Sequence, residues 1–210
     1  MEISMQRGIN PIFPLPIFLD EAEYDEYTKI QKELTCAKNE LKFNDNGSNM
    51  ILNDDPFNSN FLIDKKCNNT INLISNTVNK FFISLYGDHN KLLKNDWAIA
   101  ESWMTKTIKG RSAKHHDHGI ADISGVYYLD TNGNDGNLVL CSIHNQLQCN
   151  MLLYDLIDHG DIKMPLENGM IFLWPGQFKH YTLVNETDHE RVSVSFNISL
   201  TRKGLGIPPV

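Results

Sequence analysis

The sequence has few cysteines and no long apolar run, and each shortage excludes a class of protein. The cysteines show no CxxC spacing and are few for the chain length, so we expect free thiols in a reducing compartment instead of a disulfide framework; they are Cys36, Cys67, Cys141 and Cys149. No apolar run approaches the roughly 18 residues that span a bilayer, and no signal segment opens the chain. We therefore expect a cytoplasmic protein without a membrane partner.

Positive charge is also in short supply. The formal net charge is -7, and a generally acidic surface repels phosphate backbones, so nucleic acid is not an expected partner. Hydrophobic residues make up 41% of the 210 residues and charged residues 21%, which is ordinary globular composition. This length and composition predict a single domain, residues 1–210, with a sizeable core.

The first 96 residues contain most of the helical signal. Residues 12–19 alternate apolar residues with prolines and predict an edge strand, after which Asp20 is the expected N-cap of a helix that ends near residue 38. Residues 39–69 predict a long loop with a short turn of helix near residues 61–63. The apolar spacing from residue 70 onward predicts a second helix that ends near Gly87. Both helices are predicted to support a sheet.

From Trp97 onward the sequence predicts strands. Glycine-containing turns separate short apolar runs without intervening helices, which is typical of an antiparallel sandwich or small barrel. The expected fold class is therefore α+β, with a helical N-terminal support (1–96) and a β core (97–210). The predicted strands are 97–108, 123–130, 138–142, 151–154, 170–174, 180–184 and 192–200.

A cluster of potential metal ligands precedes the strand at 123–130. In an extended backbone, alternate residues share a face, so either His115 with Asp117 or His116 with His118 could bind a metal ion. The two pairs could not enter one site together. His180, at the start of a later predicted strand, is placed to supply a third ligand. Such a set leaves open coordination positions, as in iron(II) centres, although imidazole suits iron and zinc alike.

An arginine begins the last predicted strand. With a period of two, Arg191 shares a face with Ser193 and Ser195, opposite the apolar residues of the same run. A buried arginine is costly unless it is paired, and its planar guanidinium matches a carboxylate with two hydrogen bonds. We therefore expect Arg191, with Ser193 beside it, to anchor a carboxylate co-substrate whose other end reaches the metal.

Several motifs together resemble a family of 2-oxoglutarate/iron(II)-dependent oxygenases found in marine bacteria and phages, within the prolyl-hydroxylase-like superfamily. That family shows His-x-His before Ser-Gly-x-Tyr-Tyr, then Phe-Pro-Ser, a histidine and Arg-x-Ser. Here Trp174-Pro175-Gly176 replaces Phe-Pro-Ser, a conservative change. The segments that carry the resemblance are Phe13–Ile17, Glu101–Trp103, His116–His118, Ser124–Tyr128, Gly169–Pro175, His180 and Arg191–Asn197.

The resemblance implies a double-stranded β-helix core of the jelly-roll, cupin-like type. It implies His116, His118 and His180 as the metal ligands and as the catalytic centre. Arg191, with help from Ser193, would bind the far carboxylate of 2-oxoglutarate. Tyr128 is similar in position to tyrosines that contact this co-substrate in relatives, and it is equally well explained as an aromatic core residue.

The function implied is hydroxylation with Fe(II), 2-oxoglutarate and O2, releasing succinate and CO2. The substrate would be an unidentified protein or small molecule, and a homodimer is among the expected partners. One question of register stays open. A carboxylate would offset charge on iron, which favours His115 and Asp117, whereas the spacing to Ser124-Gly125 favours His116 and His118, the pair we prefer.

Two other classes of function compete with this reading. The first is a cupin-like metal-binding barrel that uses three histidines without 2-oxoglutarate, as an isomerase, a dioxygenase or a sensor. The second is a non-catalytic binding module that keeps the fold. The role of Arg191 separates the first alternative from the oxygenase, and metal content after iron reconstitution separates the second.

Overall fold

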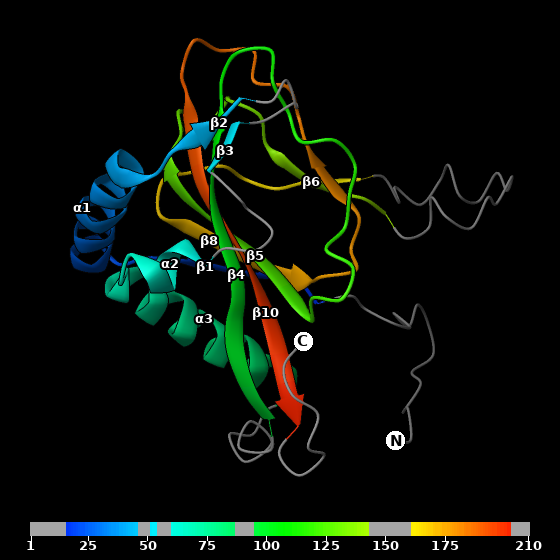
Figure 1. The fold of residues 1–210 in the computed structure, drawn as a ribbon. Helices are drawn as coiled ribbons and strands as arrows, with labels where there is room; N and C mark the ends of the chain where they lie inside the picture. The colour runs from blue at the N-terminus through cyan, green and yellow to red at the C-terminus, as the bar shows by residue number, and fades with distance from the viewer. Residues whose placement is uncertain (1–15, 46–50, 54–59, 87–94, 143–160, 203–210) are drawn as a thin grey trace, which may run out of the picture.

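Thirteen elements make up the described part of the chain in the computed structural model, which describes residues 16–45, 51–53, 60–86, 95–142 and 161–202 (Figure 1). In order they are β1 (Phe18–Glu21), α1 (Tyr24–Glu40), β2 (Phe43–Asn44), β3 (Ile51–Asn53), α2 (Phe61–Asp64), α3 (Asn68–Tyr86), β4 (Asn95–Thr107), β5 (Ile123–Asp130), β6 (Leu138–Leu140), β7 (Ile162–Lys163), β8 (Met170–Pro175), β9 (His180–Thr182) and β10 (Arg191–Arg202).

The strands form two antiparallel sheets. The major sheet has the order β1-β8-β5-β10-β4-β3-β2, and the minor sheet has the order β7-β6-β9. Because β10 lies between β5 and β4, residues from the end of the chain pair with residues on both neighbouring strands. The predicted α+β class with an antiparallel β core of the double-stranded β-helix type is confirmed.

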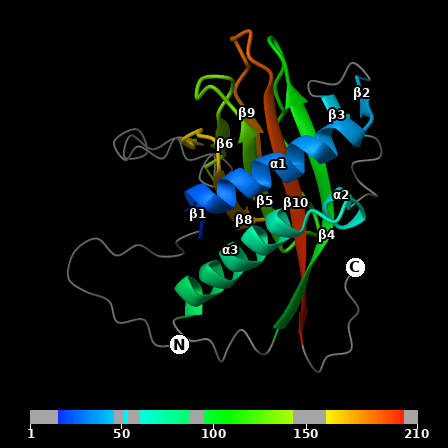
Figure 2. The same cartoon turned by 90° about the vertical axis from the view of Figure 1, so that its left-hand side faces the viewer.

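The major sheet is covered on both faces. Helices α1 and α3 lie across one face, and the minor sheet lies on the other side (Figures 1 and 2). The larger hydrophobic core joins the helices to the major sheet and includes Val192, Val194 and Phe196 of β10. A smaller core joins residues of β5 and β8 to Leu138 and Leu140 of β6. The opposite face of β10 is thus left for polar residues between the two sheets.

The two long helices are joined by a side-chain cap. Glu33 in α1 accepts hydrogen bonds from the backbone N–H groups of Asn69 (2.9 Å) and Thr70 (2.9 Å) at the start of α3. It also accepts one from the Thr70 hydroxyl at 2.7 Å. The first N–H groups of a helix have no partner within the helix, and the helix dipole favours a negative charge there. Glu33 therefore fixes the start of α3 against α1.

The N-terminal part differs from the prediction at two places. Asp20 lies in β1 and forms an ion pair with Lys80 (2.7 Å), so it is not the N-cap of α1; that position is Glu23. Between residues 39 and 69 the structure has β2 and β3 at the edge of the major sheet, where a loop was predicted, while the short helix α2 is confirmed. Strands of two or three residues are too short to show a period, so pairing determines them: β3 pairs with β4, and β2 pairs with β3.

Most predicted strands of the C-terminal part are confirmed. The strand predicted at 123–130 matches β5 in both bounds, and β4, β6, β8, β9 and β10 lie within a few residues of their predicted ranges. Strand β7 was not predicted. The strand predicted at 151–154 lies outside the described residues.

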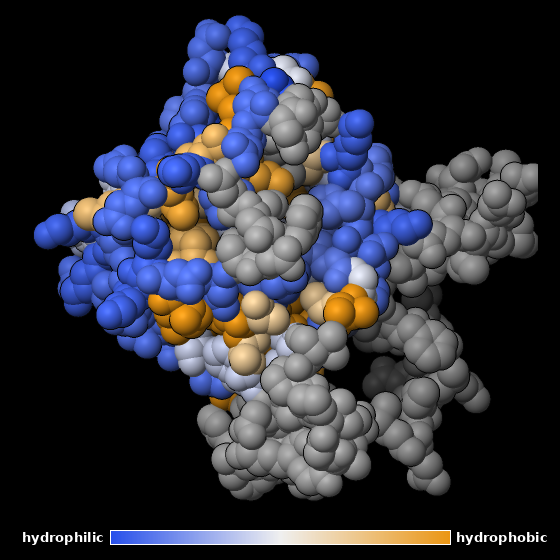
Figure 3. Space-filling view, in the orientation of Figure 1, coloured by the Kyte–Doolittle hydropathy of each residue, from blue (hydrophilic) through white to orange (hydrophobic). Residues whose placement is uncertain are grey.

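Figure 3 shows one face of the described surface. In the view of Figure 3 it is mostly hydrophilic, with smaller hydrophobic patches between the polar areas. No helix among the described residues is long and apolar enough to cross a bilayer. Cys36, Cys67 and Cys141 are free thiols, and Cys149 lies outside the described residues.

Gly125 in β5 is required by the packing of the major sheet. A Cβ atom at this position would lie 2.8 Å from Cδ2 of Leu173 and closer still to the ring of Phe196. We expect Gly125→Ala to lower the free energy of unfolding by about 1–3 kcal/mol, the usual cost of overpacking a core. Urea denaturation measures this. The double variant Gly125→Ala/Phe196→Leu should lose less free energy of unfolding than the two single variants lose together. An unchanged free energy of unfolding in Gly125→Ala would show that this position has room for a Cβ atom.

Candidate active site

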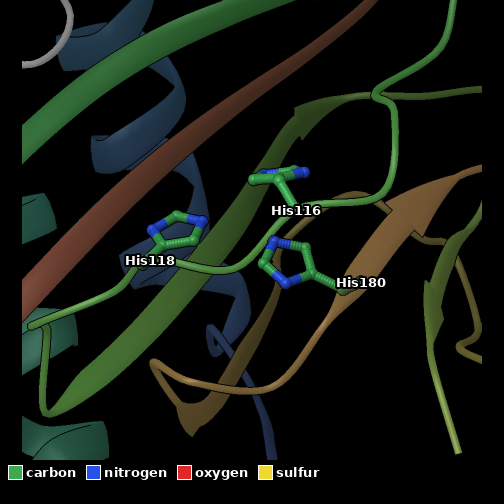
Figure 4. Close-up of side chains that lie close together, drawn as sticks. All are labelled: His116, His118 and His180. Atoms are coloured by element: carbon green, nitrogen blue, oxygen red, sulfur yellow. The ribbon is translucent and has the colours of Figure 1, made fainter. Parts of the chain in front are cut away.

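Three histidines from two chain segments meet between the sheets. His116 and His118 lie in the segment before β5, and His180 begins β9. The segment is paired to β9, because the backbone N–H groups of His116 and His180 each donate to the other's carbonyl oxygen at 3.0 and 2.9 Å. One ligand atom from each of the three side chains lies within 4.8 Å of the other two, and the rings turn toward a common space (Figure 4).

Backbone carbonyl groups set the tautomers of two of these rings. Nδ1 of His116 lies 2.7 Å from the carbonyl oxygen of Lys114, and Nδ1 of His180 lies 2.8 Å from that of Phe178. A carbonyl oxygen only accepts, so each Nδ1 carries the proton and each Nε2 carries a free lone pair. Metal-binding histidines are oriented in this way.

The third ring is held by a chain of side chains. His118 Nδ1 donates to Asn197 Oδ1 (2.6 Å), which also accepts from the Ser124 hydroxyl (3.0 Å). Asn197 Nδ2 donates to Glu101 Oε2 (2.7 Å), and because a carboxylate accepts, this contact fixes the orientation of the Asn197 amide. The ring of Trp103 stacks on His118 with centroids 5.5 Å apart. Nε2 of His118 is thus also left to bind a metal.

The sequence reasoning assigned no role to Asn197 or Glu101. A signal for Asn197 was present, because it continues the alternate face of Arg191, Ser193 and Ser195 in β10. Glu101 gave no such signal, since its contact depends on the pairing of β4 with β10, where Glu101 lies opposite Asn197.

Burial keeps two of the histidines neutral. It lowers the pKa of His118, and it lowers the pKa of His180 to about 3, with the neighbouring His116 as the next cause. A buried imidazolium loses hydration and is repelled by a neighbouring one. Metal binding requires the neutral imidazole, so these two rings are available as ligands without losing a proton at neutral pH.

The lowered pKa of His180 makes stability depend on pH. The unfolded chain protonates this residue near 6.5 and the folded chain only near 3, so the metal-free protein loses stability as the pH falls through this interval. We expect His180 to contribute a loss of about 2 kcal/mol between pH 6.5 and pH 5. Urea denaturation of the wild type and His180→Asn at both pH values isolates this contribution. Equal losses in the two proteins would contradict it.

His115 and Asp117, the alternative pair of ligands, do not join the group that contains His180. The ring of His115 stacks on the ring of Tyr181, with centroids 4.1 Å apart. The exposed carboxylate of Asp117 accepts a hydrogen bond from the backbone N–H of Gly119 (3.0 Å). Neither side chain belongs to the group that contains His180. The structure therefore brings His116 and His118, and not His115 and Asp117, into contact with His180.

Arg191 is buried at the start of β10 with only neutral hydrogen-bond partners. Its side chain is 2% exposed, and its guanidinium donates to the carbonyl oxygen of Asp135 (3.2 Å) and to the hydroxyl of Thr107 (3.0 Å). Its Nε has no hydrogen-bond partner, and among the described residues no carboxylate lies within ion-pair distance of it. Burial lowers its pKa. The charge of Asp135 raises this pKa without direct contact. A buried guanidinium that lacks a contacting carboxylate is costly, so an anion would stabilise it.

A glycine allows this position of Arg191. Gly136 has φ +97°, and a Cβ atom there would lie 3.2 Å from Nη1 of Arg191 and closer still to the carbonyl oxygen of Leu183. Only glycine adopts this backbone conformation without strain, and any side chain would displace the guanidinium.

A pocket of about 500 Å³, measured out to its open mouth, connects Arg191 with the three histidines. Its floor is a row across three paired strands: Tyr128 of β5, Ser193 of β10 and Thr105 of β4 lie opposite one another. Burial raises the pKa of Tyr128 to about 12, so its hydroxyl remains a neutral donor. Nε1 of Trp174, which also lines the pocket, is buried without a partner.

Comparisons with known proteins agree with this arrangement. Residues 101–197 match a family model described as "Putative 2OG-Fe(II) oxygenase". No curated protein matches the chain.

Similar folds occur among solved structures. The non-heme alpha ketoglutarate dependent epimerase SnoN from nogalamycin biosynthesis is 12% identical, with a TM-score of 0.61 over 93% of this chain and 88% of that one. A prolyl-4-hydroxylase from Pseudomonas putida is 13% identical, with a TM-score of 0.55 over 88% and 92%. An oxidoreductase of the 2OG-Fe(II) oxygenase family from Burkholderia pseudomallei is 12% identical, with a TM-score of 0.56 over 80% and 76%.

The fold and the site together define a class. Two antiparallel sheets that enclose three convergent imidazoles and a buried arginine form a double-stranded β-helix with a candidate metal site. The family match is more specific: residues 101–197 match the "Putative 2OG-Fe(II) oxygenase" family model, which indicates an enzyme of that class. A family of this description uses Fe(II) and 2-oxoglutarate, with O2 as a co-substrate.

Proposed function

We propose that this enzyme is a hydroxylase in which His116, His118 and His180 hold Fe(II) through their Nε2 atoms. The observation that carries the proposal is the common direction of the three rings, since every Nδ1 already donates to an oxygen. One ligand nitrogen from each ring lies within 4.8 Å of the other two, a spacing that small ring movements would adapt to one ion.

We also propose that Arg191 and Ser193 bind the far carboxylate of 2-oxoglutarate. The Arg191 guanidinium has no carboxylate partner among the described residues, and its Nε has an unused donor. A carboxylate in the pocket would supply the missing charge and accept from Nε. The Ser193 hydroxyl and the neutral Tyr128 hydroxyl line the same floor and are placed to donate to the co-substrate.

The protein would position the reactants and control access of water. Fe(II) with 2-oxoglutarate and O2 supplies the oxidising chemistry of this class, with succinate and CO2 as products. Asn197 and Trp103 would keep the ring of His118 in place. Val126, Leu138 and Trp174 give the pocket apolar walls that exclude water from the reacting atoms.

The proposal extends to the substrate class and to the domain organisation. The substrate is a protein or small molecule that is hydroxylated at a C–H bond and enters through the open mouth of the pocket. Residues 1–210 form a single oxygenase domain, in which 1–96 support the core formed by 97–210 and also contribute β1, β2 and β3 to the major sheet. Location in the cytoplasm and assembly into a homodimer stay predictions.

Anaerobic titration tests this function. The purified chain with Fe(II) should develop a weak visible charge-transfer band on addition of 2-oxoglutarate, and exposure to O2 should then yield succinate. Omission of Fe(II) is the matched control and should give neither signal. Absence of both the band and succinate from the complete mixture would overturn the proposal.

A further inference from the structure

A second group of potential metal ligands lies outside the pocket. His115, Cys141 and Asp161 each offer one ligand atom, and the three atoms lie within 4.8 Å of one another. None of the three residues lines the pocket that contains His116. His115 is adjacent to His116 in sequence, and its ring is stacked on Tyr181.

Strand register brings this group together. Leu140 of β6 lies opposite Ile162 of β7, so the next residue on one strand, Cys141, lies opposite the preceding residue on the other, Asp161. Residues directly opposite in an antiparallel pair point to the same face of the sheet. His115 enters from the segment paired to β9, which is the neighbour of β6 on its other side. Three segments far apart in sequence thus meet at one end of the minor sheet.

Each ligand is held by further contacts. The carboxylate of Asp161 accepts a hydrogen bond from the backbone N–H of Ser142 (3.0 Å), and the Tyr181 hydroxyl lies 3.4 Å from its other oxygen. The backbone N–H of Cys141 donates to the carbonyl oxygen of Lys179 at 2.9 Å. The stacking of His115 on Tyr181 fixes the plane of the imidazole. Groups oriented in this way lose little freedom when they bind an ion.

The ligand types point to a particular kind of cation. A thiolate, an imidazole and a carboxylate are all ligands of Zn²⁺, whereas Mg²⁺ and Ca²⁺ select oxygen ligands. A thiolate and a carboxylate together carry two negative charges, which a divalent cation would neutralise. Tetrahedral Zn²⁺ separates its ligand atoms by about 3.3–3.8 Å, so shifts of about 1 Å from the present spacing are sufficient.

The surroundings are compatible with entry of an ion. His115 and Asp161 are exposed and Cys141 is half-buried, so solvent reaches the group from one side. Burial raises the pKa of the Cys141 thiol, and the negative charge of Asp161 raises it further, while Lys179 lowers it. A cation between the thiol and the carboxylate would offset their repulsion and favour the thiolate.

We propose that His115, Cys141 and Asp161 bind a divalent thiophilic metal ion, with Zn²⁺ as the expected occupant and water as the fourth ligand. This site is separate from the proposed iron site and does not depend on the proposed hydroxylase function. Because His115 directly precedes His116, an ion bound here would tether the segment that carries His116 and His118.

Titration of the metal-free full chain with Co²⁺ tests the site. Co²⁺ replaces Zn²⁺ in tetrahedral sites, and a thiolate ligand gives it a near-ultraviolet sulfur-to-cobalt charge-transfer band. The proposed iron site contains no sulfur, so the band does not arise from that site. We expect the wild type and His118→Ala to show the band with Co²⁺, Cys141→Ser to lack it, and His115→Ala to bind the ion at least about tenfold more weakly.

Cys36→Ser is the matched control, because Cys36 is an exposed free cysteine on α1 and lies in neither group. It should retain the full band, and so should the wild type with excess Mg²⁺ present. Absence of the band from the wild type, its persistence in Cys141→Ser, or its loss in Cys36→Ser would each overturn the proposal. All variants are to be compared at equal folded fraction by circular dichroism.

Discussion

Replacement of His180 with alanine is expected to lower Fe(II) affinity and succinate formation by at least about a hundredfold. Loss of a residue that only supports a metal ligand costs about 10–100-fold, and loss of the ligand itself costs more. His180 is 4% exposed, and its Nε2 faces those of His116 and His118 (Figure 4). Equilibrium dialysis with Fe(II) under argon and succinate assays measure the two effects.

His189→Ala is the control for this prediction. His189 is a partly exposed histidine next to Asp130, with 3.2 Å between Nε2 and the carboxylate, and it lies outside the pocket. Its replacement should leave Fe(II) affinity within about twofold of the wild type, because its ring contacts Asp130 and Asp135 and none of the three proposed metal ligands. Full Fe(II) binding by His180→Ala, with the fold intact, would contradict the proposed ligand set.

Replacement of Arg191 with glutamine is expected to raise the KM for 2-oxoglutarate by at least about 30-fold and to leave Fe(II) binding unchanged. Truncating one partner of a buried charged pair costs about 2–5 kcal/mol. Glutamine keeps a donor near Thr107, which now accepts from the guanidinium at 3.0 Å, but removes the positive charge. Succinate assays over a range of 2-oxoglutarate concentrations, with Fe(II) dialysis in parallel, separate the two quantities.

Arg111→Gln is the matched control, because Arg111 forms an ion pair with Asp45 (3.2 Å) at the surface. Surface ion pairs contribute about 0–1 kcal/mol, so this change should alter neither KM nor Fe(II) affinity. An unchanged KM in Arg191→Gln would show that the carboxylate binds elsewhere.

The alternation of β10 was the most informative signal in the sequence. A period of two placed Arg191, Ser193 and Ser195 on one face, and the structure has all three on the pocket side, while Val192 and Val194 enter the helix-facing core. The alternation determines which face of the sheet each side chain occupies, because successive side chains on a strand point to opposite sides. The antiparallel β core could be predicted for the same reason.

The register of the histidine segment could not be settled from local spacing alone. Periodicity divides residues 115–118 into two pairs without selecting either one. The selection comes from the bridge between His116 and His180, a contact between residues far apart in sequence. The same holds for the chain from His118 through Asn197 to Glu101, which exists only because β10 pairs with β4.

The two wrong predictions in the N-terminal part also result from contacts between residues far apart in sequence. Asp20 fits the local chemistry of a helix cap, but β1 pairs with β8 and extends through this residue, which then contacts Lys80 of α3. Strands β2 and β3 are too short for a period; pairing with β4 determines β3, and pairing with β3 determines β2. Tertiary pairing overrides local preference most easily where a segment is short.

The most direct test of the central claim is a crystal structure of the chain with Fe(II) and 2-oxoglutarate, prepared under argon. Anomalous scattering at the iron edge locates the metal independently of the protein coordinates. The account predicts one iron peak bound by Nε2 of His116, His118 and His180, with the far carboxylate of 2-oxoglutarate on Arg191. An iron peak bound by His115 and Asp117, or a co-substrate that does not contact Arg191, would contradict it.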